Sequence, residues 1–326
     1  MAEAWFGAAA LLNGCKCRGG SLTRPKIIVM KAIIFPGQGS QYLGMGKSLY
    51  DNFPQAKDIF SSIDNILGVK LSEKCFLGPE SELKDTATQQ LAILAVSLAA
   101  FEVIVEKKIN FDYCSGLSLG EYSCLYASGV LSLDKIVLLV KKRAKAMQEA
   151  AALSSATMFA VIGLAREKLE AEAVSQGFYL ANINSPQQIV ISLAKADKEN
   201  IRKSLESKGA KVIELAVSGG FHSRFMDSAK KALEDVIKEM DFSPARTPIV
   251  SNVTARAHTQ PQEIKDNLVK QLNSTVLWSD CVNFMVNKGV SEFFEVGPGK
   301  VLKGLIRKIN PQVKVTNIEK KEDYEF

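Results

Sequence analysis

Two residue types in this 326-residue chain could perform covalent chemistry: a serine in a tight turn and a histidine near a strand end. Gly116-Leu-Ser118-Leu-Gly120 matches the pattern G-x-S-x-G, in which small flanking residues allow a sharp strand-to-helix turn that exposes the hydroxyl. A serine hydroxyl at its ordinary pKa is a poor nucleophile and needs a base. The pentapeptide alone is a weak signal, and the alternative is that Ser118 only caps the following helix.

The chain offers two histidines as the base. His258 lies in the polar stretch 256–261, where we expect a surface residue. His222 follows two glycines directly after a predicted strand, and functional residues often lie on loops at strand ends. Because imidazole exchanges protons near neutral pH, His222 is the better candidate, with a purely structural histidine as the alternative.

A glycine loop and an arginine have less specific patterns. The loop Pro36-Gly-Gln-Gly-Ser-Gln41 is not a dinucleotide fingerprint, because Tyr42 stands where the third glycine belongs, and it lacks the lysine of a P-loop. It could present backbone N–H groups to an oxyanion or form a simple tight turn. Arg143 lies in a basic helical run. Its guanidinium suits a bidentate contact with a carboxylate, but the pattern equally fits a solvated basic face.

Short apolar runs that alternate with helical patterns must position these residues. We predict strands at 31–35 and 110–114 and helices at 45–66, 91–106 and 132–150. A helix also follows Ser118 to about residue 128. Later in the chain, strands at 249–253 and 292–296 accompany a helix at 224–240 and a final helix near residue 300. Strands that alternate with helices favour a parallel sheet covered by helices.

The middle of the chain has a different order. Strands are predicted at 157–163, 178–184, 188–193 and 211–217, with helices at 166–176 and 197–208. This β-α-β-β-α-β order is typical of a ferredoxin-like unit. We therefore predict an α/β protein in which a large subdomain, residues 31–152 and 217–318, carries an inserted small subdomain, residues 153–216. Residues 1–30 would be a disordered leader, a transit peptide or a cloning scar, and residues 319–326 a solvated tail.

The composition excludes several classes of protein. Hydrophobic residues make up 47% and charged residues 23%, which is a globular rather than a disordered or fibrous balance. The net charge of +6 is spread along the chain, without the basic block of a nucleic-acid-binding protein. Six scattered cysteines and two histidines show no zinc-ligand spacing, so we expect reduced thiols in a cytoplasm-like compartment. The apolar stretch 91–105 is short and contains Glu102, which favours a buried helix over a membrane span.

Taken together, the motifs resemble the malonyl-coenzyme A:acyl carrier protein transacylases, the malonyltransferases of fatty-acid synthesis. The resemblance runs in order from about Lys31 to about Lys308. The matching segments are Phe35-Pro-Gly-Gln-Gly-Ser-Gln41, Gly116-Leu-Ser-Leu-Gly-Glu-Tyr-Ser123, Arg143 with Met147-Gln148, Asn184-Ser-Pro with Gln188, Phe221-His-Ser223, Ser251-Asn-Val-Thr254, Gln271-Leu272 with Trp278, and Glu295-Val-Gly-Pro-Gly-Lys300.

The resemblance implies a hydrolase-like α/β core with an inserted ferredoxin-like subdomain, and it implies catalytic roles. Ser118 would be the nucleophile that carries the malonyl ester, and His222 would be its base. The backbone carbonyl of Gln271 would orient the imidazole in place of a carboxylate. The backbone N–H groups of Gln38 and Leu119 would form the oxyanion hole.

The resemblance also implies a substrate pocket and partners. Arg143 would bind the malonyl carboxylate, with Gln90, Met147 and Phe221 as further pocket residues. The malonyl group would move from malonyl-CoA to the enzyme and then to the phosphopantetheine thiol of acyl carrier protein, in ping-pong fashion. We expect no bound cofactor and no metal. We also expect a cytoplasmic monomer that binds neither nucleic acid nor membrane, or a plastid protein if residues 1–30 are a transit peptide.

Three other functions stay open at this point. A malonyl acyltransferase that serves a polyketide synthase in trans would share every residue named above. A serine esterase needs only G-x-S-x-G, and it predicts fast hydrolysis of the acyl-enzyme without a role for Arg143. A non-catalytic binding protein is disfavoured because Ser118 and His222 are both present.

Overall fold

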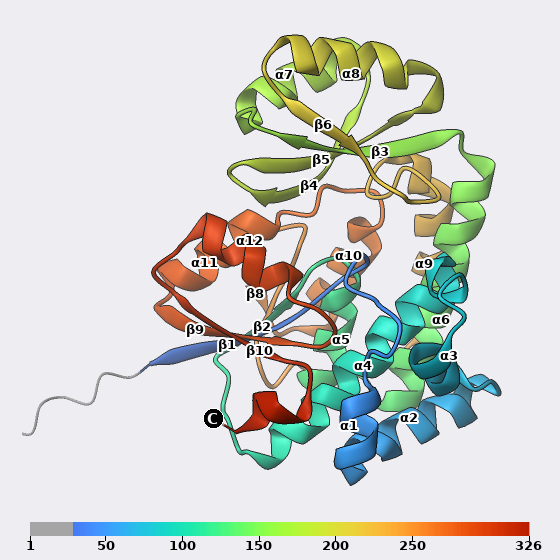
Figure 1. Cartoon of the computed structure of the whole chain (residues 1–326), viewed down its shortest axis with the longest axis vertical. Helices are drawn as coiled ribbons and strands as arrows, with labels where there is room; N and C mark the ends of the chain where they lie inside the picture. Colours follow the sequence, from blue (N-terminus) through green and yellow to red (C-terminus); the bar gives the residue numbers. More distant parts are fainter. Residues whose placement is uncertain (1–28, 326) are drawn as a thin grey trace, which may run out of the picture.

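The computed structural model describes residues 29–325, so almost all of the predicted leader lies outside the described residues. The described chain contains a six-stranded sheet of order β10-β9-β1-β2-β7-β8 and a four-stranded sheet of order β4-β5-β3-β6 (Figure 1). The strands of the large sheet are β1 (Met30–Phe35), β2 (Tyr113–Gly116), β7 (Ile249–Val250), β8 (Ala257–His258), β9 (Val290–Val296) and β10 (Lys314–Ile318).

The large sheet is parallel from β10 to β7, and only β8 pairs antiparallel. Its helices are α1 (Lys47–Asn52), α2 (Pro54–Leu67), α3 (Leu71–Leu77), α4 (Thr86–Glu106), α5 (Leu119–Ala127), α6 (Leu133–Leu153), α9 (Asp227–Glu239), α10 (Pro261–Gln271), α11 (Trp278–Asn287) and α12 (Val301–Ile309). Side chains alternate across a strand, so Ile33 and Phe35 of β1 face one core with α2, α4 and α6. Ala32 and Ile34 face the other core, with α11 and α12. Helices therefore cover both faces of the sheet.

The small sheet lies above the large one in Figure 1 and carries two helices on its outer face. Its elements are β3 (Ala156–Ile162), α7 (Arg166–Gln176), β4 (Tyr179–Ser185), β5 (Gln188–Ala194), α8 (Lys198–Ser207) and β6 (Lys211–Glu214). All of its strand pairs are antiparallel, and the elements follow the expected β-α-β-β-α-β order. Phe159 and Val161 of β3 pack under these helices, whereas Met158 and Ala160 join the core of the larger part. The two parts therefore share buried surface.

Several predicted elements differ in extent from the observed ones. The expected helix at 45–66 is two helices, because Pro54 begins α2 at a position where its missing N–H costs nothing. The strand expected at 110–114 is β2, which begins at Tyr113. The strand expected at 249–253 ends at Val250, where a turn closed by the Ala255 N–H on the Ser251 carbonyl begins. That turn carries Asn252, whose side chain contacts the nucleophile candidate Ser118.

Residues 319–325 are not a solvated tail, which corrects that part of our expectation for residues 319–326, and residue 326 lies outside the described residues. Lys321–Tyr324 form a 3₁₀ turn, η4, and the Tyr324 side chain is buried. The Tyr324 hydroxyl donates to the carbonyl of Ala100 in α4 at 2.8 Å, and its ring packs against Phe53. The residues around Tyr324 in the sequence are mostly charged, so the charge pattern does not predict that this tyrosine is buried.

Helix α4 is a core helix. Among residues 29–325 it is the one helix long and apolar enough to cross a membrane, but 72% of its most apolar window is buried inside the protein. It packs against α2, α5 and α6, which matches the expected buried helix at 91–106. Its apolarity is therefore explained by its position in the core.

Candidate active site

Ser118 lies at the sharp turn between β2 and α5. Its backbone has a positive φ of 53° with ψ −99°, a conformation that costs a non-glycine residue free energy. A side chain on Gly116 would lie 2.1 Å from the backbone of Gly120, and one on Gly120 would lie 2.0 Å from the Phe35 carbonyl oxygen. The two glycines therefore let strand, turn and helix approach closely. The Ser118 side chain makes no capping hydrogen bond to α5, so the alternative of a simple helix cap does not describe it.

Ser118 and His222, 104 positions apart in the sequence, are in direct contact. The Ser118 Oγ lies 2.8 Å from His222 Nε2, and His222 Nδ1 lies 2.8 Å from the backbone carbonyl oxygen of Gln271. Because a carbonyl only accepts hydrogen bonds, Nδ1 carries the proton and Nε2 presents its lone pair to the serine. Burial, together with the positive charge of Arg143, lowers the pKa of His222 to about 4, against the opposing effect of its hydrogen bond to the Gln271 carbonyl. The imidazole is thus neutral at pH 7 and can accept a proton.

Arg143 is fully buried and reaches the nucleophile, so it is not part of a solvated basic face. Its Nη1 donates to Gln90 Oε1 at 2.6 Å, and its Nη2 donates to Ser118 Oγ at 3.0 Å and to Gln271 Oε1 at 3.1 Å. The guanidinium lies 4.7 Å from the centre of the Tyr122 ring. Within residues 29–325 its Nε has no hydrogen-bond partner, and no carboxylate forms an ion pair with it. A buried cation with no carboxylate in direct contact is suited to binding an anion.

The backbone N–H groups of Gln38 and Leu119 lie on the two segments that meet at the turn. Leu119 is the first residue of α5, where N–H groups have no partner inside the helix. The loop of Gln38 packs against the turn, since a side chain on Gly37 would lie 2.3 Å from the Leu117 carbonyl oxygen. In the part of the chain that the structure describes, neither N–H group has an acceptor. Both can therefore donate to an oxyanion.

The other predicted pocket residues differ in how closely they join this cluster. Gln90 and Met147 are fully buried, and Gln90 Nε2 lies 3.6 Å from Met147 Sδ, so both belong to the surroundings of Arg143. Phe221 is buried and precedes the base, and its carbonyl accepts from the Ser192 hydroxyl of β5. His258 lies on β8 and contacts Thr254 and Glu263 instead.

Sequence reasoning missed two side chains beneath the nucleophile. Asn252 accepts from the Ser118 N–H at 2.7 Å and donates to the Gly116 carbonyl at 2.8 Å. Glu121, 2% exposed, accepts from the Asn252 N–H at 3.1 Å and from the Gln271 side-chain amide at 2.7 Å. Burial raises the pKa of Glu121 to about 7, against the hydrogen bonds from Gln271 and Asn252. Both residues lie inside matched motifs, but their partners are more than 130 positions away, so spacing gives no signal for these contacts.

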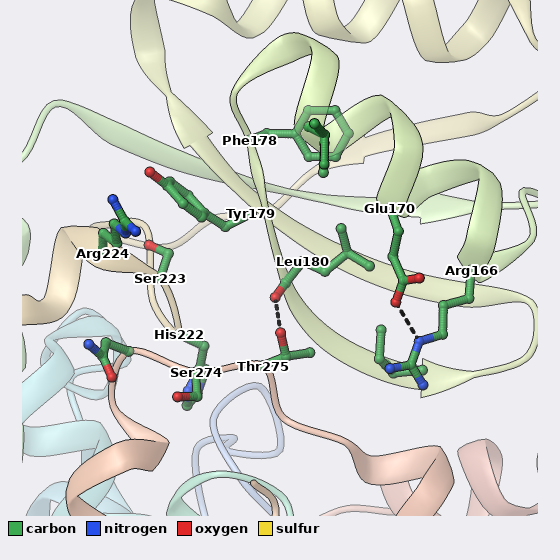
Figure 2. A pocket seen from close by; sticks show the side chains of 14 residues that line it. Arg166, Glu170, Phe178, Tyr179, Leu180, His222, Ser223, Arg224, Ser274 and Thr275 are labelled. Atoms are coloured by element: carbon green, nitrogen blue, oxygen red, sulfur yellow. Dashed lines mark hydrogen bonds and ion pairs between the residues drawn. The ribbon is translucent and has the colours of Figure 1, made fainter.

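A pocket of about 580 Å³ opens beside the base (Figure 2). It is lined by α7 and β4 of the small sheet, by residues 222–224 and by residues 273–275. The Thr275 hydroxyl donates to the Leu180 carbonyl of β4 at 2.7 Å, which ties the segment after Gln271 to the small sheet. The pocket therefore lies between the small sheet and the segment that holds His222, and His222 is one of its lining residues.

Comparisons with known proteins show which chains this one is similar to. The family model of the acyl transferase domain matches residues 32–320. The chain is 40% identical over 301 residues to the malonyl CoA-acyl carrier protein transacylase of Bacillus subtilis (strain 168), which covers 90% of this chain and 95% of that protein. It is 41% identical over 298 residues to the protein of that name from Staphylococcus aureus (strain MRSA252), with 90% and 96% covered.

Solved structures of similar proteins have the same fold. The malonyl CoA-acyl carrier protein transacylase of Clostridium perfringens superposes with a TM-score of 0.88 at 35% identity, covering 91% of this chain and 95% of that chain. A malonyl-transacylase solved in complex with its type II polyketide synthase acyl-carrier protein superposes with a TM-score of 0.86 at 35% identity, covering 90% and 97%.

Proposed function

This chain belongs to the malonyl-CoA:acyl carrier protein transacylases, an acyl transferase family, and on that basis we propose how its own residues move the malonyl group. The protein transfers malonyl from malonyl-CoA to the phosphopantetheine thiol of acyl carrier protein, the reaction that supplies fatty-acid synthesis. The observation that carries the residue assignment is the 2.8 Å contact between Ser118 Oγ and His222 Nε2.

The first half-reaction loads the enzyme. His222 Nε2 takes the Ser118 proton, and Ser118 Oγ attacks the thioester carbonyl of malonyl-CoA. The backbone N–H groups of Gln38 and Leu119 stabilise the oxyanion, and one such donor contributes about 3 kcal/mol in comparable sites. When the carbon–sulfur bond breaks, coenzyme A leaves with the proton that His222 held. A malonyl ester on Ser118 remains.

The second half-reaction reverses these steps with a different thiol. The phosphopantetheine thiol of the carrier protein gives its proton to His222 and attacks the malonyl ester. The tetrahedral oxyanion again uses Gln38 and Leu119, and Ser118 regains its proton as the ester bond breaks. Because both thiols use one site in turn, the kinetics are ping-pong. These steps use protein groups and the two substrates alone, and we propose that no metal or cofactor takes part.

Arg143 selects the acyl group. Its buried guanidinium touches Ser118 Oγ and forms no direct ion pair with a carboxylate among residues 29–325, so the free carboxylate of a malonyl ester can bind where acetyl offers nothing. A plain esterase has no need for a buried arginine beside its nucleophile. The second candidate, a transacylase that serves a polyketide synthase, is favoured by the relative solved with a polyketide synthase carrier protein. Rates with fatty-acid and polyketide carrier proteins separate these two functions.

The fate of the acyl-enzyme tests the proposed function. After loading with malonyl-CoA and removal of free substrate, the malonyl adduct should be stable in buffer. It should pass rapidly to carrier protein that bears the phosphopantetheine arm. Carrier protein without the arm is the control and should leave the adduct in place. An adduct that disappears into water at the same rate with and without carrier would identify an esterase instead.

We further propose that the enzyme works as a monomer in a reducing compartment such as the cytoplasm. Of the six cysteines, the four in the described part of the chain, at positions 75, 114, 124 and 281, are free and buried, which is consistent with such a compartment. If residues 1–30 act as a transit peptide, the compartment would be a plastid. Size-exclusion chromatography with light scattering tests the monomer, and fractionation of the source cells tests the compartment.

A further inference from the structure

We propose that Glu121 is a positioning residue that sets the preference for malonyl by fixing the side-chain amide of Gln271 against Arg143. The inference rests on the function proposed above. Glu121 lies in the first turn of α5, three residues after the nucleophile, and it is buried beneath the reacting atoms. Gln271 links it to the rest of the site, because its backbone carbonyl contacts His222 while its side chain lies between Glu121 and Arg143.

The contacts of the Gln271 amide allow one orientation. Glu121 Oε2 accepts from the Asn252 backbone N–H, and this acceptor oxygen requires the Nε2 of Gln271 at their 2.7 Å contact. The same Nε2 donates to the Ser118 carbonyl at 3.0 Å. The remaining amide oxygen, Oε1, therefore faces Arg143 and accepts from Nη2 at 3.1 Å. A reversed amide would place oxygen against two acceptors and an NH₂ group against the guanidinium.

This orientation determines where the guanidinium lies. Arg143 Nη1 is held by Gln90, and Nη2 is shared between Gln271 Oε1 and Ser118 Oγ. The position of Nη2 beside the nucleophile is where a malonyl ester would place its carboxylate. Without Glu121, the amide of Gln271 loses the shortest hydrogen bond of its Nε2 and keeps the longer one to the Ser118 carbonyl, so it is held less firmly against Arg143 and turns more readily. A turned amide repels Nη2 from this position. Malonyl binding would then weaken, whereas acetyl, which has no carboxylate, would be affected far less.

Glu121 is also connected to the turn of Ser118 through Asn252, and losing this connection has a different effect from losing the contact with Gln271. Its Oε2 accepts from the Asn252 backbone N–H, and the Asn252 side chain holds the Ser118 N–H and the Gly116 carbonyl. This link supports the turn that carries the nucleophile, so its loss slows malonyl and acetyl transfer by the same factor. The ratio of the two rates isolates the contribution of the Gln271 link.

The test measures acylation by malonyl-CoA and by acetyl-CoA with intact-protein mass spectrometry. Glu121→Ala and Gln271→Met should each lower the malonyl rate about tenfold more than the acetyl rate, as expected for the loss of one charge-assisted contact. Gln271→Met keeps the backbone carbonyl that contacts His222. Glu121→Gln keeps an acceptor oxygen and should restore most of the malonyl preference. Because the two residues act through one contact, the double variant Glu121→Ala/Gln271→Met should lose little further preference.

Asp64→Asn is the matched control. Asp64 is another buried carboxylate. It lies in α2 and accepts hydrogen bonds from the N–H and the hydroxyl of Ser72 in α3, so its replacement should leave the ratio of malonyl to acetyl rates unchanged. Equal slowing of both acyl groups in Glu121→Ala and Gln271→Met would overturn the inference. If Glu121→Ala does not fold, a wild-type ratio in Gln271→Met alone would overturn it as well. A wild-type enzyme that forms no malonyl adduct would instead contradict the proposed function itself.

Discussion

Ser118 and His222 both have positive backbone φ angles, of 53° and 56°. Such conformations cost non-glycine residues about 1–3 kcal/mol each, so the surrounding contacts must hold them. Asn252 binds the Ser118 N–H, and the Gln271 carbonyl binds the imidazole of His222. These partners come from distant parts of the chain, so the complete fold is needed to hold nucleophile and base together.

Arg143→Ala tests the selectivity of the site. The variant should slow acylation by malonyl-CoA by roughly a hundredfold or more, because a buried carboxylate without its partner costs about 3–5 kcal/mol. Acylation by acetyl-CoA should change far less. Rapid-quench mass spectrometry of the acyl-enzyme measures both rates. An equal loss with the two substrates would mean that the arginine is structural.

The pH dependence of acylation follows from the pKa of His222, which burial lowers to about 4. A base works in its neutral form, so the acylation rate should be flat from pH 7 to about pH 5 and should fall as the pH approaches 4. A free imidazole, with a pKa near 6.5, would lose activity earlier. The profile should be measured in wild type and in Glu121→Gln, so that titration of Glu121 is not mistaken for His222. A midpoint near 6.5 in both proteins would contradict the assignment.

The same shift affects folding stability. The unfolded state binds a proton on this histidine below about pH 6.5, whereas the folded state binds it only near pH 4. The neutral form of His222 therefore makes its full contribution to the free energy of unfolding above pH 6.5. This contribution is lost as the pH falls from 6.5 toward 4.

At the scale of elements, the close contact between β1, β2 and α5 shapes the site. Gly120→Ala would place a methyl group 2.0 Å from the Phe35 carbonyl oxygen, so α5 must move away from β1. We expect a loss of about 3 kcal/mol in the free energy of unfolding, together with slower acylation, because the oxyanion donor Leu119 begins this helix. Urea denaturation measures the stability.

Gly304→Ala in α12 is the control for this substitution. No atom lies within 4 Å of the position that its methyl group would take, so alanine should stabilise the helix by about 1 kcal/mol. If both variants have the same unfolding free energy, the close approach of the Phe35 carbonyl is not the reason that position 120 requires glycine.

The C-terminal turn η4 is a second test at this scale. Tyr324→Ala removes a buried ring and its hydrogen bond to the Ala100 carbonyl in α4, and it should cost about 3 kcal/mol of unfolding free energy. Val174→Ala, at a side chain that is 89% exposed in α7, should cost less than about 0.5 kcal/mol. Similar stabilities for the two variants in thermal or urea unfolding would show that the chain end is not anchored.

Across the whole molecule, the sequence predicted the elements whose pattern is local. Apolar runs predicted β1 and β9, and the strand before the turn predicted where Ser118 lies. The strand predicted at 211–217 ends at Glu214, so His222 follows eight residues after the end of β6 and not directly after a strand. The β-α-β-β-α-β order was also local. The contacts of Glu121 could not be predicted, because its partners lie 131 and 150 positions away. The burial of Tyr324 was hidden by the charged residues around it.

The site draws on both parts of the molecule. Ser118 follows β2 of the large sheet, while α7 and β4 of the small sheet line the pocket beside His222 (Figure 2). Because one face of the small sheet, with Met158 and Ala160, contributes to the larger core, the small sheet is packed firmly against the larger part. One wall of the pocket beside His222 therefore comes from the small sheet and its helix α7, and the other from residues 222–224 and 273–275.

Locating the acyl group on the enzyme is the sharpest test of the proposed mechanism. Wild-type protein, mixed with malonyl-CoA, quenched in acid and digested, should yield a malonyl adduct on the peptide that contains Ser118, and fragmentation should place it on that residue. The His222→Ala protein should form the adduct far more slowly. A malonyl group found on another residue, or an adduct that survives in Ser118→Ala, would contradict the assignment of Ser118 as the nucleophile.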